Sequence, residues 1–287
     1  MNRLTNSWEL IKASAAVLRA DKELIVFPIV SGVLTLLVTL TFAVPAFLAG
    51  IIDQTATRGG VPFVGYVVAF LFYLAQYFVI IFCNSALVGA ALMRLDGGKP
   101  TVRDGFRIAF AHLGTIFGYA LISATVGLIL RTISRRGGII GQVVSSLFGL
   151  AWNLATYLVI PVLVIENAGP IDAIKRSAQY LRRTWGEQLA GNLGVGLVFG
   201  LLFFAVILVT GGAIFLAAAA HVAVLIIPII VIAVLAMLVL GLISSALSGI
   251  YEAAVYRYAA QGKVDSYFSP QLVQNAFKTK GTSSAKL

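Results

Sequence analysis

The sequence is poor in the residues that build most metal, redox and catalytic sites. Its 287 residues include one cysteine, Cys83, and two histidines, His112 and His221. A single cysteine excludes a disulfide framework, and two histidines far apart in sequence argue against a zinc or di-iron cluster. The motifs GxSxG, HExxH, P-loop and GxGxxG after a strand are also missing. We therefore expect no metal, no cofactor and no enzymatic activity.

Charged residues are scarce as well, and long apolar runs take their place. Only 11% of the residues are charged and 60% are hydrophobic, whereas soluble domains have roughly 25% and 45–50%. Apolar runs long enough for a membrane-spanning helix recur six times. The sequence therefore predicts an all-α, polytopic membrane protein with six transmembrane helices, at Leu24–Ile52, Val61–Leu92, Gly114–Leu130, Ile139–Ile165, Leu189–Ala220 and Val222–Tyr251.

Acidic residues are few, and the position of the basic ones predicts topology rather than nucleic-acid binding. The six spans place four basic residues on one side of the membrane, namely Arg58, Arg131, Arg135 and Arg136. The other seventeen, including all those in the terminal segments, fall on the opposite side. The positive-inside rule then puts both termini in the cytoplasm. We predict a multi-pass protein of the cell (cytoplasmic) membrane with no nucleic-acid partner.

Each predicted pair of spans follows a short, charged, amphipathic stretch. These stretches are Ser7–Arg19, Val102–Gly114 and Pro170–Arg182. The first aligns without gaps on the third, so that Lys12 falls on Lys175 and Ser14 on Ser177. Such self-similarity predicts three hairpin repeats, each preceded by a cytoplasmic amphipathic helix. We expect the apolar stripe of the first helix, at Ile11, Ala15 and Leu18, to face lipid.

The repeats define the expected domain organisation. We predict a single membrane domain over residues 1–263, with repeat units at about 7–95, 101–166 and 170–263, followed by a cytoplasmic C-terminal tail, 264–287. In the middle unit, Thr101 with Asp104 is a helix-start signal.

Several short motifs resemble one known family. They are GPIDAIKRS at 169–177, TWGE at 184–187, GN at 191–192, NSAL at 84–87 and GKPTVRDG at 98–105. Together they resemble a prokaryotic six-helix integral membrane family known only as a domain of unknown function. The chain is also loosely similar to the membrane domain of some glycerophosphodiester phosphodiesterases. The resemblance implies a six-helix fold over nearly the whole chain, and it brings no activity with it.

Polar side chains within the predicted spans are the first candidate functional residues. Unpaired polar groups are costly in hydrocarbon, so those retained there have a partner or a function. One hypothesis is that they bond helix to helix. The other is that they line a hydrated path for a solute or a lipid headgroup. The candidates are Asn84, Ser123, Thr125, Asn153 and Ser245.

Charged side chains at the span edges form two further groups. We predict a cytoplasmic ion-pair belt of Glu166, Arg176, Glu187 and Glu252. Glu252 is also the best candidate for a proton-linked or substrate-binding carboxylate. A second group, on the predicted outer side, is interpreted either as an anion site or as arginines that reach lipid headgroups. Its members are Arg131, Arg135 and Arg136.

Two functions remain open from the sequence. The first is a channel or transporter-like protein for an ion, small solute or lipid, with a polar path between the repeats. The alternative is a non-enzymatic scaffold or partner subunit that binds anionic lipid or protein through its basic cytoplasmic helices. Expected partners are membrane lipids, anionic on the cytoplasmic face. The small-residue faces Gly114xxxGly118 and Gly196xxxGly200 are interpreted first as close packing within the monomer and second as contacts with another copy of the chain.

Overall fold

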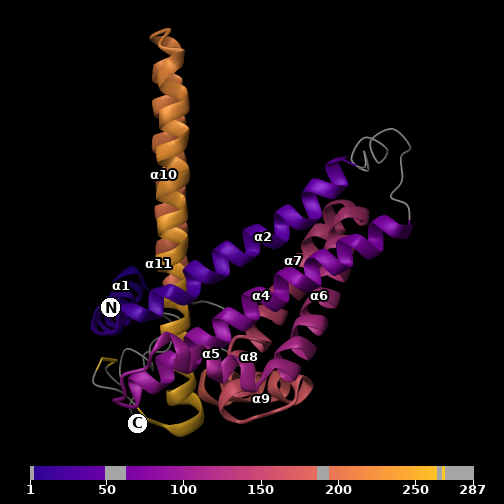
Figure 1. Cartoon of the computed structure of the whole chain (residues 1–287), viewed down its shortest axis with the longest axis vertical. Coiled ribbons are helices and arrows are strands. Elements are labelled where there is room, and N and C mark those ends of the chain that lie inside the picture. The colour runs from indigo at the N-terminus through magenta and orange to yellow at the C-terminus, as the bar shows by residue number, and fades with distance from the viewer. Residues whose placement is uncertain (1–2, 49–62, 186–193, 264–266, 269–287) are drawn as a thin grey trace, which may run out of the picture.

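The computed structural model describes residues 3–48, 63–185, 194–263 and 267–268, and within these ranges all regular structure is helical (Figure 1). The predicted all-α class is therefore confirmed for the described part of the chain. In chain order the elements are α1 (Arg3–Ala20), η1 (Lys22–Ile25), α2 (Val26–Leu48), α4 (Phe63–Leu95), α5 (Val102–Ala111), α6 (Leu113–Arg136), α7 (Gly138–Ala155), α8 (Val159–Ile165), α9 (Pro170–Trp185), α10 (Gly194–Ala219), η3 (Ala223–Leu225) and α11 (Ile226–Gln261).

Six helical segments are long and apolar enough to cross a membrane, and they correspond one for one to the six predicted spans. They are Lys22–Phe47, Val64–Leu95, Leu113–Arg135, Gly138–Ile165, Val198–Ala219 and Ile226–Gln261. The chain is thus a polytopic membrane protein. The predicted turn between the last two spans is confirmed, because α10 ends at Ala219 and His221 has a left-handed φ of 58°. Predicted span residues 49–52, 61–62 and 189–193 lie outside the described residues.

The fourth span, predicted at Ile139–Ile165, corresponds to the candidate span Gly138–Ile165, which is not one continuous helix. It is divided into α7 and α8, and the chain leaves helical geometry between Ala155 and Val159. Pro161 explains the break, since its ring blocks the carbonyl of Tyr157 and it has no N–H to donate. The Leu158 N–H released by the break donates to Ser177 Oγ of α9 at 2.9 Å. The next helix along the chain, α9, therefore satisfies the interrupted backbone.

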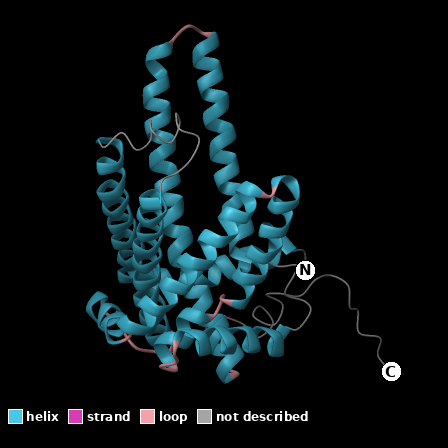
Figure 2. Cartoon of the chain, turned by 90° about the vertical axis from the view of Figure 1, so that its right-hand side faces the viewer, coloured by secondary structure: helices cyan, strands magenta, loops and turns pink. Residues whose placement is uncertain are grey.

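The centre of the bundle is α4, which packs against α2, α5, α6, α8 and α11. Gln76 of α4 ties it to α2 by donating from Nε2 to Thr39 Oγ1 at 2.8 Å. The buried core lies near the ends of the spans where α5, α8 and α9 gather, toward the foot of Figure 1. Beyond this core α10 and α11 rise side by side past the other helices, as Figure 2 shows.

Helices α1, α5 and α9 each precede one pair of spans, as predicted. The apolar stripe of α1 was expected to face lipid, and that prediction is wrong at Ile11, which is only 8% exposed. Helix α1 packs against α10 and α11 instead, with Leu10, Ser14 and Val17 also buried. This packing buries apolar side chains of α1 against other helices, and burial of apolar surface is favourable. The threefold repeat and the side of the membrane on which these helices lie stay predictions.

Candidate functional site

A small polar cavity lies where α2, α4 and α11 meet. Its volume is about 140 Å³. Roughly four or five water molecules fill the same volume in liquid water. Six of the lining residues carry a hydroxyl, thiol, amide or carboxyl group. The lining residues are Phe27, Pro28 and Ser31 of α2, Ile80, Cys83, Asn84 and Leu87 of α4, and Ser245, Ser248, Gly249 and Glu252 of α11.

Helical periodicity explains why these residues share one space. The lining residues of α4 stand at positions i, i+3, i+4 and i+7, and those of α11 repeat the same spacing. Residues with this spacing form one face of a helix. The close approach of the two faces requires Gly249, because a Cβ there would lie 2.5 Å from Leu87 Cδ2 and 3.2 Å from Asn84 Oδ1.

Glu252 is the only acidic or basic residue among those that line this cavity. Its side chain is hydrogen-bonded to the Asn84 amide, and the residue is only 8% exposed. The Glu252 Oε1 atom is buried and has no hydrogen-bond partner among the described residues. No lysine or arginine is among the residues lining the cavity. The arrangement therefore holds a carboxyl group in an apolar setting, with one buried oxygen that has no partner among the described residues.

The cavity is open on one side rather than enclosed. Ile80, Ser245 and Ser248 line it and are exposed to the surface of the bundle, whereas Cys83 and Glu252 are buried. A ligand could thus enter between α2, α4 and α11 and reach Glu252 at the buried end.

The cavity brings together only two of the five predicted path residues, Asn84 and Ser245. Ser123 is buried in α6 and is hydrogen-bonded to Tyr119. Thr125 is exposed and donates to the carbonyl of Leu121, one turn earlier in the same helix. Asn153 is exposed on α7. Hence Ser123, Thr125 and Asn153 lie outside this cavity.

The predicted ion-pair belt corresponds in the structure to one network around Glu166. Arg176 Nη1 contacts Glu166 Oε2 at 2.6 Å, and the hydroxyls of Tyr180 and Tyr256 donate to Glu166 Oε1 at 2.8 and 3.0 Å. The hydrogen bond to Glu166 raises the pKa of Arg176. The pKa of Tyr180 is raised mainly by burial and also by its hydrogen bond to the Glu166 carboxylate. These contacts join the end of α8 to α9 and α11. Glu252 lies in the cavity instead, and Glu187 lies outside the described residues.

The predicted outer arginines lie in the last turns of α6. The Arg131 guanidinium is 5.5 Å from the centroid of the Tyr73 ring, and Arg135 is exposed. Positive side chains at a helix C-terminus are favoured by the helix dipole, which accounts for their position without an anion. Only the backbone of Arg136 is described.

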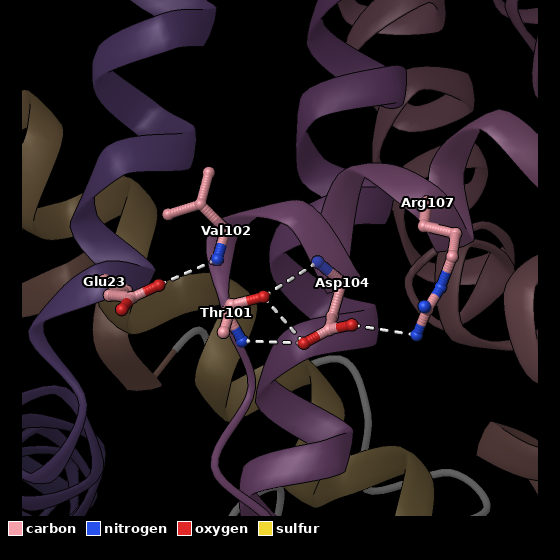
Figure 3. A network of polar contacts seen from close by, with 5 residues as sticks. All are labelled: Glu23, Thr101, Val102, Asp104 and Arg107. Atoms are coloured by element: carbon pink, nitrogen blue, oxygen red, sulfur yellow. Dashed lines mark hydrogen bonds and ion pairs between the residues drawn. The ribbon is translucent and has the colours of Figure 1, made fainter.

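A polar network fixes the start of α5 (Figure 3). The Thr101 N–H donates to Asp104 Oδ2 at 3.0 Å, and the Asp104 N–H donates to Thr101 Oγ1 at 3.2 Å. These two bonds form the capping box predicted by the spacing of the two residues. Arg107 pairs with Asp104 at 2.8 Å, and Glu23 accepts from the Val102 N–H. The bonds from Thr101 lower the pKa of Asp104.

Sequence reasoning missed Ser31 and Cys83 as lining residues. Neither residue is conspicuous in the sequence. The only usable signal was that Cys83 directly precedes Asn84 and therefore lies close to the same face of its helix. Within the described residues no group of three or more His, Cys, Asp or Glu side chains is placed to hold a metal ion.

Comparison with known proteins gives one family match. The model of a family of unknown function (DUF6159) matches residues 63–266. The matched region holds α4 and α11, and therefore two of the three helices around the cavity. No curated protein and no solved structure matches the chain.

Proposed function

The chain belongs to the family of unknown function DUF6159, and we propose that it is a transporter-like membrane protein that binds a small polar solute or a lipid headgroup between α2, α4 and α11. One observation carries the proposal: Glu252 lies within a membrane-spanning helix, is buried, and has an oxygen without a partner among the described residues. An ionisable group at such a place is expensive, which favours a role in binding.

The surroundings of Glu252 support binding rather than helix packing alone. A polar group that serves helix packing is expected to bond to another helix of the bundle. Ser177 does so, because its Oγ accepts a hydrogen bond from the Leu158 N–H. Glu252 and Asn84 instead border a space large enough for a ligand of a few non-hydrogen atoms. The exposed Ser245 and Ser248 supply further hydroxyl groups along the way in.

We place this cavity in the cytoplasmic half of the membrane, on the strength of the positive-inside rule. Glu252 is nine residues before the end of α11, a distance of about 14 Å along the helix. The same helix end lies near the basic segments that we assign to the cytoplasm. A solute would thus reach the site from that side or from the inner leaflet.

A basic surface on α9 supports a second, lipid-binding role. Gln179, Tyr180, Arg182 and Arg183 border an open hollow, and arginine suits the phosphate of an anionic headgroup. We infer that anionic lipid binds here. Native mass spectrometry should show fewer bound phosphatidylglycerol molecules on an Arg182→Ala/Arg183→Ala variant than on the parent protein. Equal lipid counts would contradict this role.

Solute flux through purified protein in liposomes tests the main proposal. The panel should contain small cations, anions, neutral polyols and phosphate-headgroup compounds. Asn84→Leu should abolish flux of the permeant solute, because it removes the amide that holds Glu252. Asn153→Leu is the matched control, since the same change on exposed α7 leaves the cavity intact. No flux for any solute, or equal loss in both folded variants, would overturn the proposal.

A further inference from the structure

We propose that the cavity selects a small organic ammonium compound and that Glu252 is its counter-charge. This inference deepens the proposed function and rests on it, because the same cavity binds the ligand. It also makes a separate claim, namely that the charge and the donor groups of the ligand decide which solute is held.

The charges around the cavity leave Glu252 without a cation from its lining residues. The lining contains no lysine or arginine. Five residues further along α11, Arg257 Nη2 pairs with Asp96 at 3.1 Å. Arg176 of α9 pairs with Glu166 at 2.6 Å. A buried carboxylate gains most from a ligand that carries the missing positive charge.

The hydrogen-bonding groups of the lining residues match an ammonium group in kind. A primary ammonium has three N–H donors and no acceptor. The lining residues carry acceptor groups, namely the Glu252 carboxyl, whose buried Oε1 lacks a partner among the described residues, the Asn84 amide, and the hydroxyls of Ser31, Ser245 and Ser248. An anion or a strong acceptor would instead face the carboxylate directly.

The apolar part of the lining favours an organic cation over a metal ion. Phe27, Ile80 and Leu87 provide hydrocarbon walls beside the polar groups. Calcium takes six to eight oxygen ligands and magnesium holds its waters tightly, whereas this cavity supplies one carboxylate. A short alkyl stem would cover the hydrocarbon walls while its ammonium group meets Glu252.

Ligand binding to the purified full chain in nanodiscs tests the inference. The probes are ethylammonium and ethanolamine, with neutral ethanol and ethylene glycol as comparisons that have the same numbers of non-hydrogen atoms. We expect the ammonium probes to bind at least tenfold more tightly than the neutral ones. Glu252→Gln should remove that preference, while Glu166→Gln, which changes a glutamate outside the cavity, should retain it.

The outcomes separate this inference from the proposed function. Binding of neutral probes as tight as that of ammonium probes, lost in Asn84→Leu, would leave the solute site standing and overturn its charge preference. No binding of any probe to the folded protein would overturn both. An unchanged preference in Glu252→Gln would also overturn the inference.

Two sources of the ammonium group can be told apart in the same system. Nanodiscs of phosphatidylglycerol alone allow only a free amine to bind. Nanodiscs that contain phosphatidylethanolamine offer the amine on a lipid, and a lipid ligand should then compete with ethanolamine and weaken its apparent affinity at least threefold. Unchanged affinity would assign the site to free amines.

Discussion

Glu166 and Glu252 are both buried or nearly so, yet their surroundings assign them different roles. Glu166 meets Arg176, Tyr180 and Tyr256, so its charge and both its oxygens are used within the protein. Glu252 shares a bond with Asn84 and keeps one oxygen without a partner among the described residues. We therefore assign Glu166 to stability and Glu252 to ligand binding.

Removal of the Tyr256 hydroxyl should loosen the junction of α8 and α11. Tyr256→Phe deletes the 3.0 Å bond to Glu166 and should lower the free energy of unfolding by about 1 kcal/mol. Solute flux should be unchanged, because Tyr256 does not line the cavity. Titration with denaturant in mild detergent measures the first effect. Flux lost without a change in stability would contradict the assignment of Glu166.

The sequence identified part of the site because polarity at membrane depth is a local signal. Asn84 and Ser245 were predicted on that ground, and Glu252 was singled out as the best carboxylate candidate. Asn153 gave the same signal, yet it lies on an exposed helix face. Which face of a helix meets its neighbours depends on packing between distant segments, and the single sequence does not record that. The predicted roles of these residues as a solute path stay predictions.

At the scale of elements, the packing of α5 depends on a missing side chain. A Cβ on Gly105 would lie 2.7 Å from the backbone oxygen of Ala86 and would also contact the Phe27 ring. Gly105 therefore lets α5 pack closely on Ala86 of α4 and on Phe27 of α2, and Phe27 also lines the cavity.

Gly105→Ala should therefore destabilise the protein by about 1–3 kcal/mol, the usual effect of overpacking. Gly114→Ala is the control, because a Cβ at Gly114 meets nothing within 4 Å. Thermal unfolding of both variants beside the parent protein makes the comparison. Equal midpoints for all three proteins would contradict the close packing of α5.

The capping box makes the start of α5 sensitive to acid. The lowered pKa of Asp104 means that its stabilising effect is complete above the ordinary value of 3.8 and is lost as the pH falls through the lower folded value. Hydrogen exchange, corrected for intrinsic rates, should show protection at the first turn of α5 falling in that acid range. Asp104→Asn should flatten this dependence, and an unchanged profile would contradict the account.

The sequence predicted the spans but not where the fourth one would divide. Long apolar runs are unambiguous, so six spans were expected and six candidate spans are found. The division of the fourth span needed a proline, which the sequence shows, and a partner for the freed N–H, which it does not show. Ser177 lies nineteen residues from Leu158 along the chain. Only the folded arrangement brings the two together.

For the whole molecule, the basic segments predict one orientation. Thr132→Cys on α6 and Gln179→Cys on α9 place a thiol at exposed positions on opposite predicted sides. In a Cys83→Ala background, an impermeant maleimide added to intact cells should label Thr132→Cys at once. It should label Gln179→Cys only after permeabilisation. The reverse pattern would invert the topology and place the cavity in the outer half.

The central claim is that a hydrated binding cavity lies among lipid-facing helices, and thiol accessibility along α11 tests it most directly. Ser248 and Val239 are both exposed on α11, but only Ser248 lines the cavity. With Cys83 replaced by alanine, a small water-soluble thiol reagent should modify Ser248→Cys at least tenfold faster than Val239→Cys, which we expect to face lipid. Equal, slow modification of the two positions in reconstituted membranes would contradict the account.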